Sequence, residues 1–307
     1  MNSTPTLAPW FRLLRLPNLL TVPGDPVAGT LLAAAAVSRV PDGLAMAAAA
    51  GASLCLYAFG LILNDLMDIE TDRAERPDRP LPSGEISVPQ ARMAAIAMAL
   101  SGLNLALTAG RLALYAAAVL AALIILYNGG AKRIPVAGVL TMGLCRGTSL
   151  VLGALALGMP ASACQWLPVL LAAAGLTLYV AAFSALAARE MEAEKPQGAL
   201  RWLPFAALLA ALPAVLVAAA AQRRPEPLIP VVYVFLMVMT LMRAWLLGGV
   251  MYRLQPVPAT IGGHIRNLLM AQACFCLAAG SRGLLPALFF VLLSFIFPRL
   301  AARFYSS

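Results

Sequence analysis

The sequence predicts an all-α protein, a polytopic bundle of helices that cross a membrane. Of the 307 residues, 62% are hydrophobic and 11% are charged, and the mean hydropathy is +0.86. Apolar runs of roughly 17 to 25 residues recur along the chain, and a helix of that length crosses the hydrocarbon core of a bilayer. The longest polar stretch covers about residues 65–92. We therefore expect one membrane-embedded domain, residues 1–307, and exclude a soluble protein.

The apolar runs define candidate spans that amount to nine or ten crossings. The count stays open because the segment at 265–281 is short and opens with Arg266 and Asn267. Such a segment fits either a full crossing or a re-entrant or interfacial position. In chain order the candidate spans are 17–37, 44–64, 93–110, 111–127, 135–157, 166–188, 202–221, 228–250, 265–281 and 284–302.

Basic residues predict the orientation, because short loops rich in Lys and Arg stay on the cytoplasmic side. With the N-terminus inside, most of the 22 Lys and Arg residues lie in inside segments. They are spread over helix ends, so the net charge of +9 fits attraction to anionic lipids and not nucleic acid binding. We expect an integral membrane protein of the bacterial inner membrane whose active site faces the cytoplasm.

Ten of the thirteen carboxylates fall into two clusters, each at the end of a long apolar segment on the predicted inner side. The spacing i, i+3, i+7 in the first cluster puts three carboxylates on one face of a helix. Two like charges about 4 Å apart repel by about 4 kcal/mol at an effective dielectric of about 20, so a cation is expected among them. Oxygen ligands favour Mg²⁺ or Ca²⁺. The three residues are Asp65, Asp68 and Asp72.

Two simpler interpretations of this region remain open. The acids could form a solvated helix end that pairs with Arg73, Arg76 and Arg79. The stretch at 75–87 contains three prolines and a glycine, which predicts a stiff loop. A stiff loop that carries arginines suits phosphate binding, although an ordinary surface loop would look similar.

The stretch N-D-L-M-D-I-E-T-D at 64–72, followed by R-P-L-P-S-G at 79–84, resembles the signature of the UbiA superfamily of intramembrane prenyltransferases. The resemblance implies about nine transmembrane helices around a central cavity in which Mg²⁺ holds a prenyl diphosphate. The prenyl group is then transferred to a small acceptor, commonly an aromatic ring. In that family the acidic motifs follow the second and sixth spans, where the hydropathy pattern independently places the two clusters here.

The resemblance also implies roles for individual residues. Asn64 and the three aspartates would support Mg²⁺ and diphosphate. The second motif is less regular, because Glu190 and Glu194 stand where aspartates are usual and Ala187 replaces an earlier acid. Glutamate is a competent Mg²⁺ ligand, so we expect this pair to bind the metal, with an ordinary acidic helix end as the alternative.

The segment Y-N-G-G-A-K-R at 127–133 resembles the family's tyrosine and basic loop after the fourth span. Tyr127 is a candidate substrate-binding residue. Lys132 and Arg133 would meet phosphate together with Arg79, unless the pair only anchors the chain at the membrane surface.

Arg146 lies within a predicted span, where a charge is costly and faces a cavity or a partner. Its partner would be the diphosphate or, alternatively, Asp25. In the first span Asn18 is a candidate for lining the cavity or for helix packing.

Three functions fit these patterns: a Mg²⁺-dependent prenyltransferase, a transporter of cations or anionic lipids, and a prenyl-lipid-binding protein without turnover. A transporter would place its acids near the bilayer midplane. Here the acids stand at helix ends beside an arginine loop, which favours the enzyme. No pattern in the sequence identifies the acceptor or the prenyl chain length.

Overall fold

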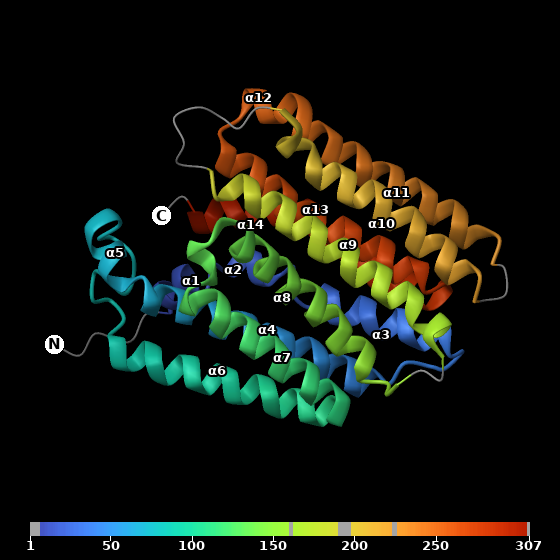
Figure 1. Cartoon of the computed structure of the whole chain (residues 1–307), viewed down its shortest axis with the longest axis horizontal. Helices are drawn as coiled ribbons and strands as arrows, with labels where there is room; N and C mark the ends of the chain where they lie inside the picture. The colour runs from blue at the N-terminus through green and yellow to red at the C-terminus, as the bar shows by residue number, and fades with distance from the viewer. Residues whose placement is uncertain (1–6, 160–161, 190–197, 223–225, 306–307) are drawn as a thin grey trace.

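The computed structural model describes residues 7–159, 162–189, 198–222 and 226–305 (Figure 1). Helices α4, α6 and α7 lie along one side of the bundle, and α9, α10, α11, α13 and α14 lie along the other (Figure 1). Helices α3 and α8 run between the two groups and contact each other. This arrangement confirms the predicted all-α bundle.

The first half of the chain begins with two short helices and a break before α3. Local sequence signals set the later boundaries. The Asp42 side chain caps α4, Ser87 and Gln90 form a capping box that starts α6, and Gly110, with a φ of 146°, makes the tight turn into α7. The helices are α1 Ala8–Leu13, α2 Leu16–Leu19, α3 Gly24–Ala36, α4 Gly43–Met67, α5 Ile69–Glu75, α6 Val88–Ala109, α7 Arg111–Gly129 and α8 Pro135–Leu155.

The second half repeats these devices. Ser162 and Gln165 form a capping box at the start of α9, and a π-helical turn at Leu247–Met251 continues α11 into α12. The helices are α9 Ala163–Ala187, α10 Leu203–Ala220, α11 Leu228–Leu246, α12 Tyr252–Leu254, α13 Val257–Ala278 and α14 Leu284–Tyr305.

Within the described ranges, eight segments are long and apolar enough to cross a membrane. Helix α13 is not among them, although it has 22 residues and most of its side chains are buried. The predicted start at residue 265 is wrong, because one continuous helix starts at Val257 and packs among α3, α9, α10, α11 and α14. Of the two alternatives left open for this segment, a continuous helix of 22 residues fits the longer one. The first predicted span is also interrupted, since α2 and α3 are separate helices.

Helices α3 and α8 are in direct backbone contact, which fixes their relative position. A Cβ atom on Gly29 would lie 1.9 Å from the carbonyl oxygen of Leu150, and one on Gly153 would lie 1.9 Å from that of Pro26. The hydroxyl of Thr30 lies 2.8 Å from the Gly153 carbonyl oxygen. Small residues permit such close approach in membrane helices, and a side chain at either glycine would push the two helices apart.

Candidate active site at the inner end of the bundle

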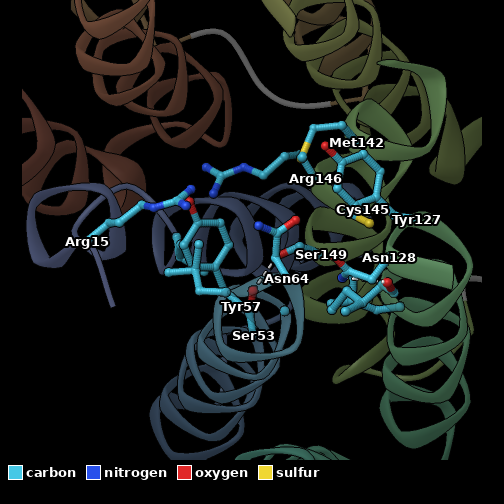
Figure 2. Close-up of a pocket in the computed structure, with 15 residues that line it drawn as sticks. Arg15, Ser53, Tyr57, Asn64, Tyr127, Asn128, Met142, Cys145, Arg146 and Ser149 are labelled. Atoms are coloured by element: carbon cyan, nitrogen blue, oxygen red, sulfur yellow. Dashed lines mark hydrogen bonds between the residues drawn. The ribbon is translucent and has the colours of Figure 1, made fainter. Parts of the chain in front are cut away.

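A cavity of about 250 Å³ lies between α4, α7 and α8 (Figure 2). The α4 residues that line it run from Ser53 to Asn64, which corresponds to about 16 Å along the helix axis. The walls combine apolar and polar groups, and the charged members are two arginines. The lining residues are Arg15, Val22, Ser53, Tyr57, Gly60, Leu61, Asn64, Leu120, Ile124, Tyr127, Asn128, Met142, Cys145, Arg146 and Ser149.

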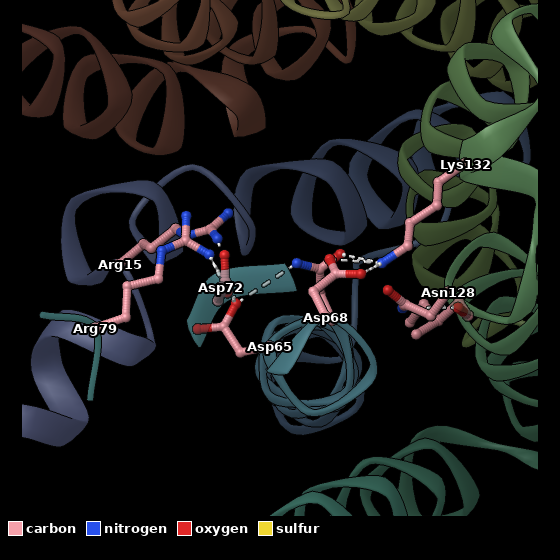
Figure 3. Close-up of polar contacts among 9 residues, drawn as sticks. Arg15, Asp65, Asp68, Asp72, Arg79, Asn128 and Lys132 are labelled. Carbon is pink, nitrogen blue, oxygen red and sulfur yellow. Dashed lines mark hydrogen bonds and ion pairs between the residues drawn. The ribbon is translucent and has the colours of Figure 1, made fainter. Parts of the chain in front are cut away.

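The first acidic cluster lies at the end of this cavity marked by Asn64, but not on one continuous helix. Helix α4 ends at Met67 and α5 begins at Ile69, with Asp68 between them at φ −98° and ψ 6°. The break turns the carboxylates apart: Asp65 and Asp72 face one group of cations and Asp68 faces another (Figure 3). The prediction of three acids on one helical face is therefore wrong in this respect.

Asp65 and Asp72 share a cation from the proline-rich loop. Nη1 of Arg79 lies 2.6 Å from Oδ2 of Asp72 and 4.0 Å from Oδ1 of Asp65. Nη2 of Arg15 lies 3.4 Å from the same oxygen of Asp65. Buried Leu81 and Ile86 anchor the loop, so Arg79 is presented by a fixed segment. Arg79 faces the acids, as the alternative in which the acids pair with nearby arginines also predicts, and phosphate binding by this loop stays a prediction.

Arg15 reaches the site from an unusual backbone conformation. Its φ of 48° and ψ of 56° lie in the left-handed region, where residues other than glycine are uncommon. The turn that this conformation makes separates α1 from α2. The guanidinium then extends into the cavity toward that of Arg146 (Figure 2).

Asp68 binds the basic loop after α7. Nζ of Lys132 lies 2.6 and 2.7 Å from the two oxygens of Asp68 and donates to Oδ1 of Asn64 at 3.2 Å. The short 3₁₀ turn Ala131–Arg133 carries this lysine to the site. Arg133, the next residue after Lys132, is exposed.

The acids and Asn64 fit a magnesium ion by their chemistry. Their oxygens are the hard ligands that Mg²⁺ prefers, and Mg²⁺ needs only one or two carboxylates when water and substrate phosphate complete its shell. One nitrogen of Arg79 already lies within ion-pair distance of both Asp65 and Asp72. In the part of the chain that the structure describes, no three acidic, His or Cys side chains converge as a complete ligand set. The remaining ligands would therefore come from elsewhere.

The other predicted site residues are placed differently from one another. Tyr127 and Arg146 line the cavity, whereas Asn18 is half-buried in α2 and is not among the lining residues. Arg146 pairs with Asp25, which is the alternative that its position in the membrane suggested. Glu190 and Glu194 lie outside the described residues. The described end of α9 lies at the same end of the bundle as the end of α4 (Figure 1).

Sequence reasoning missed several polar groups inside the cavity. Asn128 is 4% exposed, and its Nδ2 donates to the Ile124 carbonyl while no described group donates to its Oδ1. The hydroxyls of Ser53 and Ser149 lie 2.6 Å apart. Polar residues within apolar spans are the signal that could have identified all three, because such residues face protein or a cavity and not lipid.

Comparison with known proteins gives a family and a fold. A model of the UbiA prenyltransferase family matches residues 26–248. The chain is similar to the Digeranylgeranylglyceryl phosphate synthase of Ignicoccus hospitalis, with 32% identity over 156 residues, which is 51% of this chain and 50% of that protein. The chain thus spans about half the length of the curated relatives it matches.

Two solved structures have a similar fold. The apo structure of a UbiA homologue from Aeropyrum pernix aligns with a TM-score of 0.65 at 18% identity, covering 84% of this chain and 96% of that one. A UbiA homologue from Archaeoglobus fulgidus bound to GPP and Mg²⁺ aligns with a TM-score of 0.55 at 16% identity, covering 97% of this chain and all of that one, 100%. Identities this low bear on the fold, which agrees with the predicted bundle.

Proposed function

The chain belongs to the UbiA prenyltransferase family, and from that premise we propose that it transfers a prenyl group from a prenyl diphosphate to a small acceptor, in a Mg²⁺-dependent reaction within the membrane. One observation carries the proposal: at one end of a membrane-embedded cavity, three carboxylates and three basic side chains lie in alternating contact. We also propose that residues 1–307 act as one domain.

The alternating charges suit a metal-bound diphosphate. Asp65, Asp68 and Asp72, assisted by Asn64, would hold Mg²⁺, and Glu190 and Glu194 would supply further ligands. The bound metal would neutralise charge on the diphosphate. The Archaeoglobus fulgidus homologue, whose structure is bound to GPP and Mg²⁺, supports this pairing of ligands.

The basic residues would act directly on the leaving group. In the transfer, the bond between the allylic carbon and the diphosphate oxygen breaks and its electron pair stays on the diphosphate. Arg79 and Lys132 lie where they can stabilise that growing negative charge by exchanging a carboxylate for a phosphate oxygen. The acceptor atom then bonds to the carbon and loses a proton.

The apolar cavity walls would keep water from the allylic carbon. Val22, Leu61, Leu120 and Ile124 line the cavity beside the polar groups. Excluding water favours capture by the acceptor over hydrolysis. Tyr127 lies among these residues and would contact the substrate, whereas exposed Arg133 would contribute only through its charge.

The acceptor has two candidate classes. The superfamily resemblance favours an aromatic ring, and the name of the curated relatives, digeranylgeranylglyceryl phosphate synthase, favours a hydroxyl group on a glyceryl phosphate. Both classes provide a nucleophile that attacks an allylic carbon.

We propose that the membrane is the bacterial inner membrane, with the site at its cytoplasmic face. The distribution of basic residues supports the orientation. Helical spans suit an inner membrane, because bacterial outer membranes mostly hold β-barrels. The curated relative described above is archaeal, so the fractionation of a tagged chain in its own host is the direct measurement.

The test is mass spectrometry of lipid products formed by the purified chain in nanodiscs. Labelled prenyl diphosphates of several lengths are supplied with an aromatic or a glyceryl phosphate acceptor, with and without Mg²⁺. We expect a prenylated product and released pyrophosphate that both require Mg²⁺. Asp68→Asn should lower the rate about 100-fold or more, because the site loses a charge that holds the diphosphate complex.

A matched control is Glu70→Gln, which removes a carboxylate two residues away whose side chain is 80% exposed. It should keep the wild-type rate. Tight donor binding without product for any acceptor would favour a binding protein, and ion or lipid flux into liposomes without product would favour a transporter. Full activity of Asp68→Asn would contradict the assignment of the site.

A further inference from the structure

Arg146 is buried inside the membrane bundle, yet it forms part of the cavity wall. The residue is 7% exposed and lies in the middle of α8. An arginine in a membrane protein needs a partner for its charge, and an unpaired buried charge is strongly destabilising. The partner and its surroundings therefore decide where the guanidinium points.

Asp25 contacts one edge of that guanidinium. Nε of Arg146 lies 2.8 Å from Oδ2 of Asp25, and Nη2 lies 3.2 Å from Oδ1. The Nη2 contact is a hydrogen bond, whereas Nε and Oδ2 are in ion-pair contact without hydrogen-bond geometry. Both contacts lie on the same edge of the guanidinium, which orients that edge toward Asp25. Asp25 itself is completely buried near the start of α3.

Gln272, from α13, donates to the same oxygen of Asp25 as Arg146 does. Its Nε2 donates to Oδ1 of Asp25 and to the Thr21 carbonyl oxygen, both at 2.6 Å. Nη2 of Arg146 donates to the same carbonyl at 2.8 Å. The amide and the guanidinium thus share two acceptors, and three helices far apart in sequence meet at one point.

Gly24 makes room for this arrangement. A Cβ atom at Gly24 would lie 2.2 Å from Oε1 and 2.4 Å from Cδ of Gln272. The Gln272 amide therefore packs directly on the glycine backbone. Its end could swing away from a methyl group at that position, but only by leaving Asp25.

Nη1 of Arg146 is the nitrogen of the guanidinium that is available to a ligand. Because the edge formed by Nε and Nη2 faces Asp25, Nη1 points away from it, and Arg146 lines the cavity opposite Arg15 (Figure 2). Among the described residues that line the cavity there is no carboxylate. Each arginine also contacts a carboxylate that lies outside this wall, Asp65 for Arg15 and Asp25 for Arg146. The charged groups that reach the described wall are therefore cationic, which favours an anionic ligand.

We propose that Asp25 and Gln272 are positioning residues that hold Arg146 so that its Nη1 binds an anionic oxygen of a substrate. The inference rests on the proposed prenyl transfer. The anionic oxygen belongs to the diphosphate of the donor or to a charged group on the acceptor. Neither Asp25 nor Gln272 lines the cavity, so both act through Arg146.

The experiment compares Asp25→Asn, Gln272→Met and Gly24→Ala with the wild type in nanodiscs. Each variant should lower kcat/KM about tenfold or more while the Tm of Gly24→Ala falls little, because the flexible Gln272 side chain can move aside. If Asp25→Asn fails to fold, Gly24→Ala still tests the proposal. Thr30→Val is the matched control, since it removes a polar contact at the same interface of α3 and α8 without touching Arg146.

A double-mutant cycle separates positioning from general packing. In an Arg146→Gln background, Asp25→Asn and Gly24→Ala should change kcat/KM less than about twofold, because the residue through which they act is gone. Equal effects in both backgrounds, or wild-type kcat/KM in all three single variants, would overturn the proposal.

Two further arms identify the ligand and separate the proposals. A rise confined to the KM of the donor, with weaker inhibition by pyrophosphate, assigns Nη1 to the diphosphate, whereas a rise confined to the KM of the acceptor assigns it to an acceptor anion. If the wild type forms no product with any pair, the proposed function fails. Binding of pyrophosphate and of the acceptor anion by calorimetry then tests the positioning role, and equal binding by wild type and Gly24→Ala refutes it.

Discussion

The ion pairs at the acidic cluster and the ion pair inside the cavity wall differ in their access to water. Each cluster pair has one partly exposed partner, with Asp68 at 31% and Arg79 at 27%, although Asp65 and Asp72 are themselves buried. In the inner pair both partners are buried, with Asp25 at 0% and Arg146 at 8%. Partly exposed pairs contribute little to stability and exchange partners readily, because water or a ligand replaces the lost contact. A buried pair cannot open without leaving an uncompensated charge. The cluster is therefore suited to exchange ligands, and the inner pair is suited to keep one geometry.

The largest effect that this comparison predicts is on stability. Arg146→Met should destabilise the folded state by about 3 to 5 kcal/mol, because Asp25 is left buried without its partner. Thermal unfolding in detergent, monitored by the protein's resistance to proteolysis, measures this loss of stability. Adding Asp25→Leu to Arg146→Met should recover most of the lost stability. If Arg146→Met alone stays within about 1 kcal/mol of the wild type, the buried pair contributes no more to stability than the cluster pairs do.

The next effect concerns binding at the cluster. Arg79→Met should raise the KM of the donor about tenfold to a hundredfold, because a charged hydrogen bond to phosphate is worth about 1.5 to 3 kcal/mol. Its Tm should fall less than that of Arg146→Met, because Arg79 is partly exposed and water can reach the site, although Asp72 is buried. Steady-state kinetics at fixed Mg²⁺ give the KM, and Arg79→Lys should recover part of it. A large fall in Tm with unchanged KM would make Arg79 a structural residue.

A smaller effect distinguishes two neighbouring cations. Lys132→Met should raise the donor KM about tenfold, since its ammonium lies within hydrogen-bonding distance of Asp68 and Asn64. Arg133→Met should have a weaker effect, because that side chain is exposed. Competition by pyrophosphate in the two variants measures the difference, and a stronger effect at Arg133 would reverse our assignment of the loop.

The smallest effect is expected for a fully surface pair. Arg73→Ala breaks a pair with Glu70 in which both side chains are more than half exposed, at 53% and 80%. The change in unfolding free energy should be below about 0.5 kcal/mol, and activity should not change. If activity fell as far as in Arg79→Met, net charge and not position would explain the effects at the cluster.

The sequence predicted the fold well where a helix faces lipid and poorly where it does not. Helices α4, α7 and α8 agree with apolar runs because lipid-facing residues must be apolar. The start of helix α13 was predicted eight residues too late because the helix is surrounded by protein, so residues such as Asn267 and Gln272 can be polar without facing lipid. Pro258, near its first turn, was a usable sign that the helix starts before residue 265.

The candidate site was predicted in composition more than in geometry. Local spacing identified the three aspartates but not the break at Asp68, whose partner Lys132 is 64 residues away. The cost of a charge in a membrane predicted a partner for Arg146, with the diphosphate preferred and Asp25 as the alternative, and the structure shows the pair with Asp25. Nothing in the local sequence indicates that Gln272 completes the arrangement, since it is 247 residues from Asp25.

The left-handed backbone at Arg15 has a consequence for how this chain can change. Glycine would occupy that conformation with less strain, by about 1 kcal/mol, but it would remove the guanidinium that reaches Asp65. Screens that reward heat resistance alone should therefore recover glycine there, at the expense of turnover. At the turn between α1 and α2, a substitution that raises stability is therefore expected to lower activity.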